Sequence, residues 1–347
     1  MQCGDFRVSY ASDERIFQTR LPIVGLVALL AALAFVPLFA GTYWLDVLNR
    51  IGIAIIGAVG LNILVGFTGQ ISIGHAAFLA VGAYSTAILG SKAGLPFWLT
   101  IPLAGALTSV FGLVFGVPSL RLKGLYLAIA TLAAHFITTY GIIHWEKMTN
   151  GVLGFNVAPA TVWGRPLDSD ERVFYLIYAL VVPAVFFAKN LFRTRVGRAF
   201  IAVRDRDVAA SVIGVSLYRY TLLAFVISSV YAGVAGGLMA YHSRIVFPDA
   251  FTLLVALDYL AMIIIGGMGS ILGSIFGAAF MTLLPEVLKL SATSLTGVYP
   301  NAFGLIASAR DIVFGLAIIF FLMYEPAGLA RIWERFRSYW KLWPYAY

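Results

Sequence analysis

Ten long runs of apolar residues, separated by short polar connections, restrict what this chain can fold into. A helix that crosses a bilayer needs about 20 mostly apolar residues, and most of the runs approach that length. The runs are continuous rather than alternating, which argues against a membrane β-barrel. The sequence therefore predicts an all-α, polytopic membrane protein with about ten transmembrane helices. The predicted segments are approximately residues 21–40, 47–67, 71–90, 97–117, 124–143, 173–188, 219–241, 252–268, 270–290 and 310–324.

The composition supports this class of protein and excludes others. Of the 347 residues, 61% are hydrophobic and 12% are charged, whereas soluble domains carry about 25% charged residues. The single cysteine, Cys3, excludes a disulfide framework and a cysteine metal site. The histidines are scattered, so we expect no metal site and no catalytic residue. The net charge of +8 fits basic cytoplasmic loops of a membrane protein and needs no nucleic-acid partner.

The distribution of Lys and Arg predicts the orientation in the membrane. With a cytoplasmic N-terminus, sixteen of the 24 basic residues fall in segments facing the cytoplasm and eight in segments facing outward. Basic residues favour the cytoplasmic side, so both termini are expected to be cytoplasmic. Residues 1–20 mix acidic and basic side chains, unlike a cleaved signal peptide, so we expect the first apolar run to be retained. The predicted parts are a cytoplasmic tail (1–20), a transmembrane domain (21–324) and a second cytoplasmic tail (325–347).

Two long connections are expected on opposite sides of the membrane. The outer one, residues 144–172, is rich in Gly, Asn and Pro and predicts a structured loop. The cytoplasmic one, residues 189–218, contains GRAFIAVRDRDVAASVIG (197–214). This stretch predicts a short helix that stops at a glycine. Its mixed charge favours docking of a soluble partner protein over the alternative, attachment to lipid headgroups. The candidate docking residues are Gly197, Arg198, Arg204, Asp205, Asp207, Ala209, Ala210 and Gly214.

A polar, glycine-rich turn joins the second and third apolar segments. Irregular backbone is tolerated at membrane depth only against protein or a water-filled cavity. The turn therefore predicts either a lining of the translocation path or close helix packing with polar side chains between helices. The sequence leaves both readings open. The candidate residues are Asn62, Gly69, Gln70, Ser72, Gly74 and His75.

A second glycine cluster joins the eighth and ninth segments. Gly266, Gly267 and Gly269 predict a tight reversal, with a cytoplasmic gate as the functional alternative. Asp258 is the only acidic residue expected squarely inside a span. Intramembrane carboxylates are functional candidates, but a hydrogen-bonded position near the outer interface is the favoured reading here. Segments 71–90 and 270–290 are the weakest, so either a full span or a re-entrant loop stays open for them.

The chain lacks the machinery to use ATP by itself. No GxxxxGK[ST] phosphate-binding loop occurs, so an ATPase would have to be a separate chain. Two other classes remain as alternatives. A stand-alone secondary transporter needs ion-coupling groups, for which Asp258 is the acidic candidate. An integral membrane enzyme needs a clustered nucleophile, metal or acid–base pair, and none is evident.

Five matches in the right order identify a family resemblance. They are GLNILVGFTGQISIGHAAFLAVGAYSTAIL (60–89), LKGLYLAIATLAAHFITTYG with TNGVLGF (122–141, 149–155), residues 197–240, YLAMIIIGGMGSILGSIFGAAF (259–280) and YEPAGLA (324–330). The chain resembles the LivM-type permease subunit of branched-chain amino-acid ABC importers over nearly its whole length after the first span. The stretch 197–214 resembles that family's cytoplasmic coupling loop.

The resemblance implies a function and a set of partners. We expect half of the membrane pathway for branched-chain or other hydrophobic amino acids, working by alternating access in a bacterial inner membrane. The implied partners are a second homologous permease, two cytoplasmic ATPase subunits, a periplasmic substrate-binding protein and the lipid bilayer. ATP and Mg²⁺ would bind to the ATPases, and this chain would hold no cofactor. Urea, short amides and aromatic carboxylates are the alternative substrates of such permeases.

Overall fold

The computed structural model describes residues 20–119, 122, 124–162, 165–166, 169–295, 302–325 and 327–342, and these parts are mostly helical. The long helices are α2 (Arg20–Phe39), α3 (Thr42–Leu64), α4 (His75–Ser91), α5 (Phe97–Ser119), α6 (Leu125–His144), α8 (Asp170–Leu191), α11 (Leu217–Ser243), α12 (Leu253–Gly266), α13 (Ile271–Leu295) and α14 (Ala302–Tyr324). The shorter elements are α7 (Glu146–Thr149), η1 (Gly151–Leu153), β1 (Phe155–Asn156), β2 (Thr161–Val162), β3 (Arg165–Pro166), α9 (Arg195–Asp205), α10 (Asp207–Val212), β4 (Ile245–Val246), η2 (Pro248–Phe251) and α15 (Gly328–Leu342).

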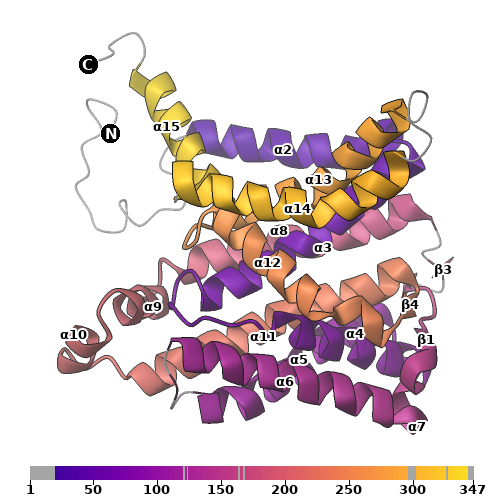
Figure 1. Cartoon of the computed structure of the whole chain (residues 1–347), viewed down its shortest axis with the longest axis horizontal. Helices are drawn as coiled ribbons and strands as arrows, with labels where there is room; N and C mark the ends of the chain where they lie inside the picture. The colour runs from indigo at the N-terminus through magenta and orange to yellow at the C-terminus, as the bar shows by residue number, and fades with distance from the viewer. Residues whose placement is uncertain are drawn as a thin grey trace.

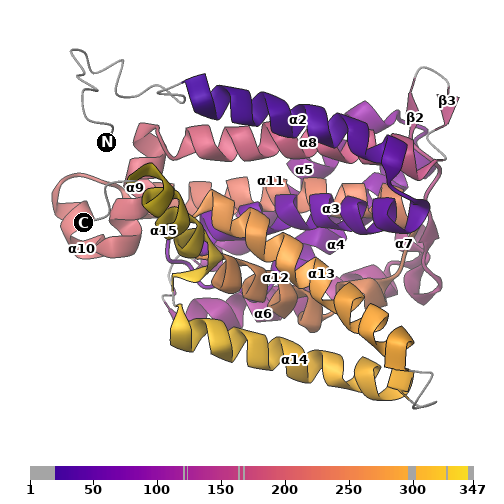
Figure 2. The same ribbon diagram turned by 90° about the horizontal axis from the view of Figure 1, so that it is seen from above.

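The long helices lie side by side, and the connections between them gather at two opposite ends (Figures 1 and 2). Helices α9, α10 and α15 lie at one end, which we call the α9 end. Helix α7 and strands β1 and β4 lie at the other, the α7 end, where β1 pairs antiparallel with β4. The two long connections predicted from the sequence therefore emerge at opposite ends of one helical bundle.

Helices α3 and α11 form the centre of the bundle. Helix α3 packs against α8, α11, α12 and α13. Of its apolar, membrane-spanning stretch, 89% is buried inside the chain. Helix α11 packs against α3, α4 and α5. The crossing of α4 and α11 is close because Gly82 faces the backbone of Gly233, where small residues let two helices approach. Large apolar side chains such as Leu61 of α3 and Phe225 of α11 belong to the core of the bundle and are fully buried.

The prediction of a helical, multi-pass membrane protein is confirmed, but the count of ten spans is not. Within the described residues, seven helices are long and apolar enough to cross a membrane. The apolar stretch Val24–Phe39 of α2 and the whole of α4 are shorter, and the end of α14 is long and apolar enough only together with α15, from which it is bent by 48°. Each of the ten predicted apolar segments nevertheless contains one long helix.

The third predicted segment, residues 71–90, is helical only from His75 onward. Helix α4 has 17 residues and is therefore about 26 Å long, shorter than the roughly 30 Å apolar core of a bilayer. Residues 69–74 precede it without regular structure. Their backbone is anchored by other helices, because the Ile73 N–H donates to the Thr131 hydroxyl of α6 at 3.0 Å. Irregular backbone at this depth is thus packed against protein, as the physics of an apolar core requires.

Candidate functional site

Two short helices project from the α9 end and carry the predicted docking residues. Helix α9 begins after Thr194, whose hydroxyl accepts a hydrogen bond from the Gly197 N–H at 3.5 Å. Helix α10 follows after a single residue and is closed by Gly214, whose φ of +90° favours glycine. The short helix that stops at a glycine is therefore present. At the start of α9, Gly197 lies so close to the Phe192 backbone that a side chain there would collide with it.

The exposed surface of α10 is more apolar than the sequence suggested. Ala210 is buried by its own chain, so its side chain packs inside rather than facing a partner. Three large apolar side chains are instead exposed, namely Val208 (70%), Val212 (82%) and Ile213 (77%). We call these three residues the α10 apolar edge. The signal that could have found them was the set of aliphatic residues interleaved with the polar ones in 205–214.

Arg204 connects α9 to the transmembrane bundle rather than facing outward to a partner. Its guanidinium donates to the carbonyl oxygen of Gly66, just beyond α3, at 2.9 Å. The same guanidinium pairs with Asp205 at 2.9 Å. The Arg204 side chain also packs over Gly69. These contacts join α9 to the α9 end of α3.

The buried amide of Asn62 extends this connection to α12 and α13. Its Nδ2 donates to the Ser270 carbonyl at 2.8 Å and to the Ser274 hydroxyl at 2.7 Å, and its Oδ1 accepts from the Gly269 N–H at 2.9 Å. All three partners of the Asn62 amide lie on the turn between α12 and α13 or at the start of α13. We define the coupling junction as Arg204, Gly66, Asn62, Gly269, Ser270 and Ser274.

The two glycine clusters have different surroundings. Gly267 and Gly269 adopt φ values of +117° and +77°, which side chains rarely adopt, so the tight reversal predicted for this cluster is present. Gly266 packs against the backbone of Gly273 in the next helix. On the other turn, Gly74 packs against the Thr131 backbone, and His75 Nε2 lies 3.1 Å from the Gly57 carbonyl oxygen.

The remaining candidates for a translocation path differ in burial, because Ser72 is buried whereas Gln70 is half-buried and Gly69 is exposed. Ser72 is buried, and its hydroxyl has no partner among the described residues. Gln70 Nε2 donates weakly to the Thr68 carbonyl at 3.4 Å. The structure places Asn62 together with the Gly269 turn, which the sequence did not foresee.

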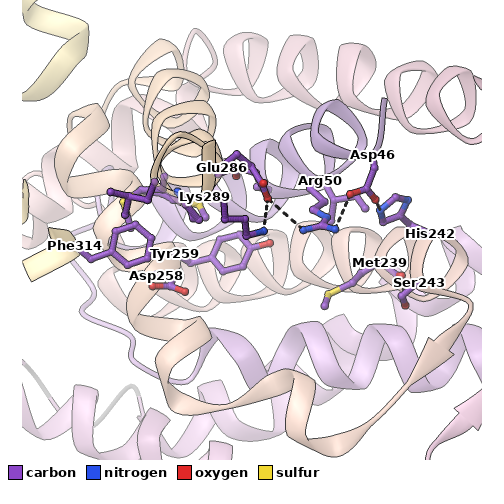
Figure 3. Close-up of a pocket in the computed structure, with 17 residues that line it drawn as sticks. Asp46, Arg50, Met239, His242, Ser243, Asp258, Tyr259, Glu286, Lys289 and Phe314 are labelled. Atoms are coloured by element: carbon purple, nitrogen blue, oxygen red, sulfur yellow. Dashed lines mark hydrogen bonds and ion pairs between the residues drawn. The ribbon is translucent and has the colours of Figure 1, made fainter. Parts of the chain in front are cut away.

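A cavity of about 830 Å³ opens between α3, α11, α12 and α13 in the half of the bundle near the α7 end (Figure 3). None of the six sequence-predicted path residues belongs to its lining. Its charged and polar lining is Asp46, Arg50, His242, Ser243, Asp258, Tyr259, Thr282, Glu286 and Lys289. Its remaining lining is apolar and includes Ile53, Ala54, Met239, Met262, Met281 and Phe314.

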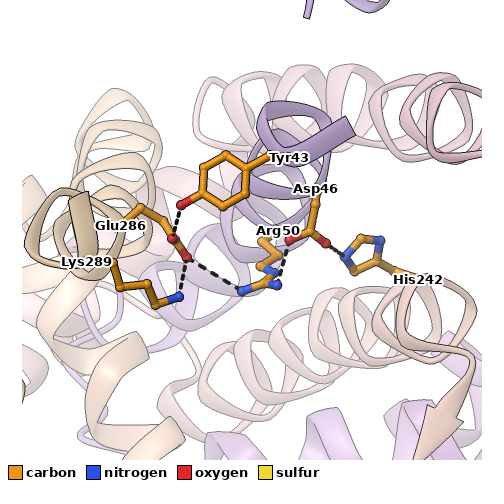
Figure 4. Close-up of polar contacts among 6 residues, drawn as sticks. All are labelled: Tyr43, Asp46, Arg50, His242, Glu286 and Lys289. Atoms are coloured by element: carbon orange, nitrogen blue, oxygen red, sulfur yellow. Dashed lines mark hydrogen bonds and ion pairs between the residues drawn. The ribbon is translucent and has the colours of Figure 1, made fainter. Parts of the chain in front are cut away.

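Ion pairs connect three helices at this cavity (Figure 4). Arg50 pairs with Asp46 one turn earlier on α3 at 2.6 Å and approaches Glu286 of α13 at 3.8 Å. Asp46 also contacts His242 Nε2 of α11 at 3.0 Å. Glu286 is only 6% exposed and is paired with Lys289 at 2.9 Å. The attraction between paired charges offsets part of the cost of removing Glu286 from water.

Most of this charged group was not predicted from the sequence. Asp258 does line the cavity, but it is not the only acidic residue well inside a helix. Glu286 lies within the predicted segment 270–290, is buried, and also accepts a 2.6 Å hydrogen bond from the Tyr43 hydroxyl. A carboxylate and a lysine three residues apart near the end of an apolar segment were the available signal.

Comparison with known proteins provides an independent assignment. The family model described as "Branched-chain amino acid transport system / permease component" matches residues 43–322. The high-affinity branched-chain amino acid transport system permease protein LivM of Escherichia coli (strain K12) is 33% identical over 288 residues, covering 76% of this chain and 68% of that protein.

More distant relatives carry other names. A probable branched-chain amino acid transport permease protein LivH of Methanocaldococcus jannaschii is 24% identical and covers 81% of this chain and 89% of its own. The fructose import permease protein FruG of Bifidobacterium longum is 27% identical, with 80% of each chain covered. No solved structure matches the chain.

Proposed function

Because the chain belongs to the permease component family of branched-chain amino acid transport systems, we propose that it forms half of the membrane pathway of an ATP-driven importer for branched-chain or other hydrophobic amino acids. The names of the LivM relatives support this substrate class over urea, short amides and aromatic carboxylates. The relatives are transport permease components rather than enzymes. Transport, not bond chemistry, is the activity of this chain.

In this proposal the chain lies in a bacterial inner membrane with its α9 end facing the cytoplasm. The excess of basic residues in 189–218 and 325–347 supports that orientation, which places both termini inside. All ten predicted segments enter the membrane, with α4 completed by the irregular residues 69–74. Residues 144–172 and the cavity then face the periplasm, where a substrate-binding protein delivers its cargo.

Two ATPase subunits bind ATP and Mg²⁺ and dock on α9 and α10 of the two permeases. The exposed α10 apolar edge supplies a surface that water solvates poorly, and apolar contact drives most protein association. The second permease subunit is a homologue of this chain, as the existence of both LivM and LivH relatives suggests. The more exposed candidates Arg198, Asp205, Asp207, Ala209 and Gly214 form the docking element together with the α10 apolar edge, whereas Gly197, Arg204 and Ala210 hold it to the bundle. The turn residues Gly69 to His75 remain candidates for the path.

One observation carries this mechanism, namely the hydrogen bond from Arg204 to the Gly66 carbonyl. It joins the predicted docking element to α3, the most buried helix, and through Asn62 to the turn between α12 and α13. These are the helices that form the outer cavity. A push on α9 therefore reaches the walls of that cavity through packed and hydrogen-bonded contacts, which alternating access requires.

The test is affinity purification of the tagged full chain from its native membranes in mild detergent. We expect an ATPase and a second permease to co-purify with it. Loss of the ATPase at high detergent with retention of the second permease would also agree with the proposal. Purification of the chain alone, with activity as a carrier in liposomes, would contradict it and return attention to Asp258 as an ion-coupling group.

A further inference from the structure

The outer cavity has the size and lining of a ligand site rather than of a bare passage. Its volume of about 830 Å³ falls within the roughly 300–1,000 Å³ that ligand pockets occupy. Charged groups of both signs and an apolar wall line the same space (Figure 3). Paired charges beside aliphatic and sulfur-containing side chains match a ligand that carries both charges and an apolar side chain.

Arg50 is suited to bind a carboxylate in this cavity. Its side chain is 52% exposed although it sits within α3. The guanidinium uses one close contact, to Asp46 at 2.6 Å, and its approach to Glu286 at 3.8 Å is too long for a hydrogen bond. A guanidinium presents five donors in a planar fork that matches a carboxylate. Glu286 is already served by Tyr43 and Lys289, so it can release Arg50 without being left unpaired.

The rest of the lining suits the other two parts of an amino acid. Asp46 and Asp258 contribute carboxylates from α3 and α12, which attract an ammonium group. Met262, Met281 and Phe314 form an apolar wall from α12, α13 and α14. Methionine side chains adapt their shape to different aliphatic ligands, which suits a site that passes several branched side chains.

We infer that this cavity is a transit site for a zwitterionic amino acid with an apolar side chain. Arg50 binds its carboxylate, Asp46 and Asp258 face its ammonium group, and Met262, Met281 and Phe314 contact its side chain. The inference rests on the proposed import function and adds to it a substrate site within this chain. The permease would then select against sugars, in addition to the selection by the binding protein.

Protection of an engineered cysteine tests the site directly. Thr282 lines the cavity and is half-buried, so Thr282→Cys in a Cys3→Ser chain places one nearly isosteric thiol inside it. The full importer complex in nanodiscs, without binding protein or nucleotide, is treated with a small thiosulfonate reagent. Leucine at about ten times its dissociation constant should slow modification roughly tenfold. Ser169→Cys, exposed at the α7 end outside the cavity, should react at the same rate with and without leucine.

Substitution of Arg50 assigns the carboxylate contact. We expect Arg50→Met to abolish protection by leucine, while the rate of modification without leucine stays similar because the cavity remains open. Arg50→Lys should restore part of the protection. Fructose at the same concentration should not protect Thr282→Cys. Equal protection by fructose would overturn the assignment to a zwitterion.

The same preparation separates this inference from the proposed function. With binding protein and ATP added, it should take up leucine after reconstitution into liposomes. Uptake without protection of Thr282→Cys would overturn the transit site and leave the importer assignment standing. Protection without ATP-driven uptake would support the site and contradict the import function.

Discussion

The guanidinium of Arg204 in α9 donates a hydrogen bond to the carbonyl oxygen of Gly66, 138 residues earlier, at the end of α3. The bond joins an element that projects from the bundle to the helix that forms its centre. In the proposed importer, Arg204 is therefore a positioning residue, which transmits force through Gly66 without touching the cargo.

Replacing Arg204 with Met should uncouple transport from ATP hydrolysis. A hydrogen bond to a charged group is worth about 1.5–3 kcal/mol, so we expect ATP-driven uptake to fall roughly tenfold or more. ATPase co-purification should persist, because the Arg204 guanidinium faces the bundle. Uptake and ATP hydrolysis are measured together in proteoliposomes. Arg195→Met, an exposed arginine on the same helix, should retain the ratio of uptake to hydrolysis; the same loss in both variants would contradict a specific role for Arg204.

Asn62→Leu should destabilise the folded chain. The substitution leaves the half-buried Gly269 N–H without its acceptor and removes the Asn62 donor from the fully buried Ser274 hydroxyl, and an unsatisfied buried group costs about 1–3 kcal/mol. We expect the midpoint of thermal unfolding in detergent to fall by several degrees. Asn190→Leu makes the same change at an exposed position in α8 and should leave the midpoint nearly unchanged. Equal midpoints for the two variants would show that the coupling junction adds no stability.

A charge on the α10 apolar edge should prevent ATPase docking. Ile213 is 77% exposed, so Ile213→Glu leaves the fold intact while adding a carboxylate that must lose its water on docking. We expect the ATPase to be absent from the purified complex and the second permease to remain. Leu153→Glu, at an 87% exposed position of the α7 end, should retain the ATPase. ATPase retained at normal stoichiometry by Ile213→Glu would place docking elsewhere.

The crossing of α4 and α11 should not tolerate even a methyl group. A Cβ on Gly82 would collide with the Gly233 backbone, so Gly82→Ala must push the helices apart. We expect a large loss of folded protein, measured as the monodisperse fraction in size-exclusion chromatography. Gly315→Ala in α14, where nothing lies near the added methyl, should keep or slightly raise that fraction because alanine is a better helix former.

The sequence predicted the helices well because their signal is local. An apolar run of sufficient length has few alternatives to a helix in a membrane, and all ten runs contain one. The start of α4 was placed too early because Ile71 and Ile73 are apolar, like helix residues. Their backbone is held instead by contacts such as that of Ile73 with Thr131, 58 residues away, which no local pattern encodes.

The site was less predictable because its parts come together only in three dimensions. Asp46, His242 and Glu286 lie on three helices, and each sits near the end of an apolar run, where a charged residue ordinarily faces water. Asn62 was recognised as costly at membrane depth, but its partners on the turn after α12 are more than 200 residues away. The exposure of the α10 edge depends likewise on which face of a six-residue helix packs against α9 and α11.

The central claim is that ATP bound to other chains drives transport through this one. The most direct measurement is leucine uptake into proteoliposomes that contain this chain with its second permease and ATPases, with substrate-binding protein outside and ATP inside. We predict uptake against a gradient that stops when ATP is omitted, and no uptake by liposomes that contain this chain alone. Concentrative uptake by the single chain without ATP would contradict the account.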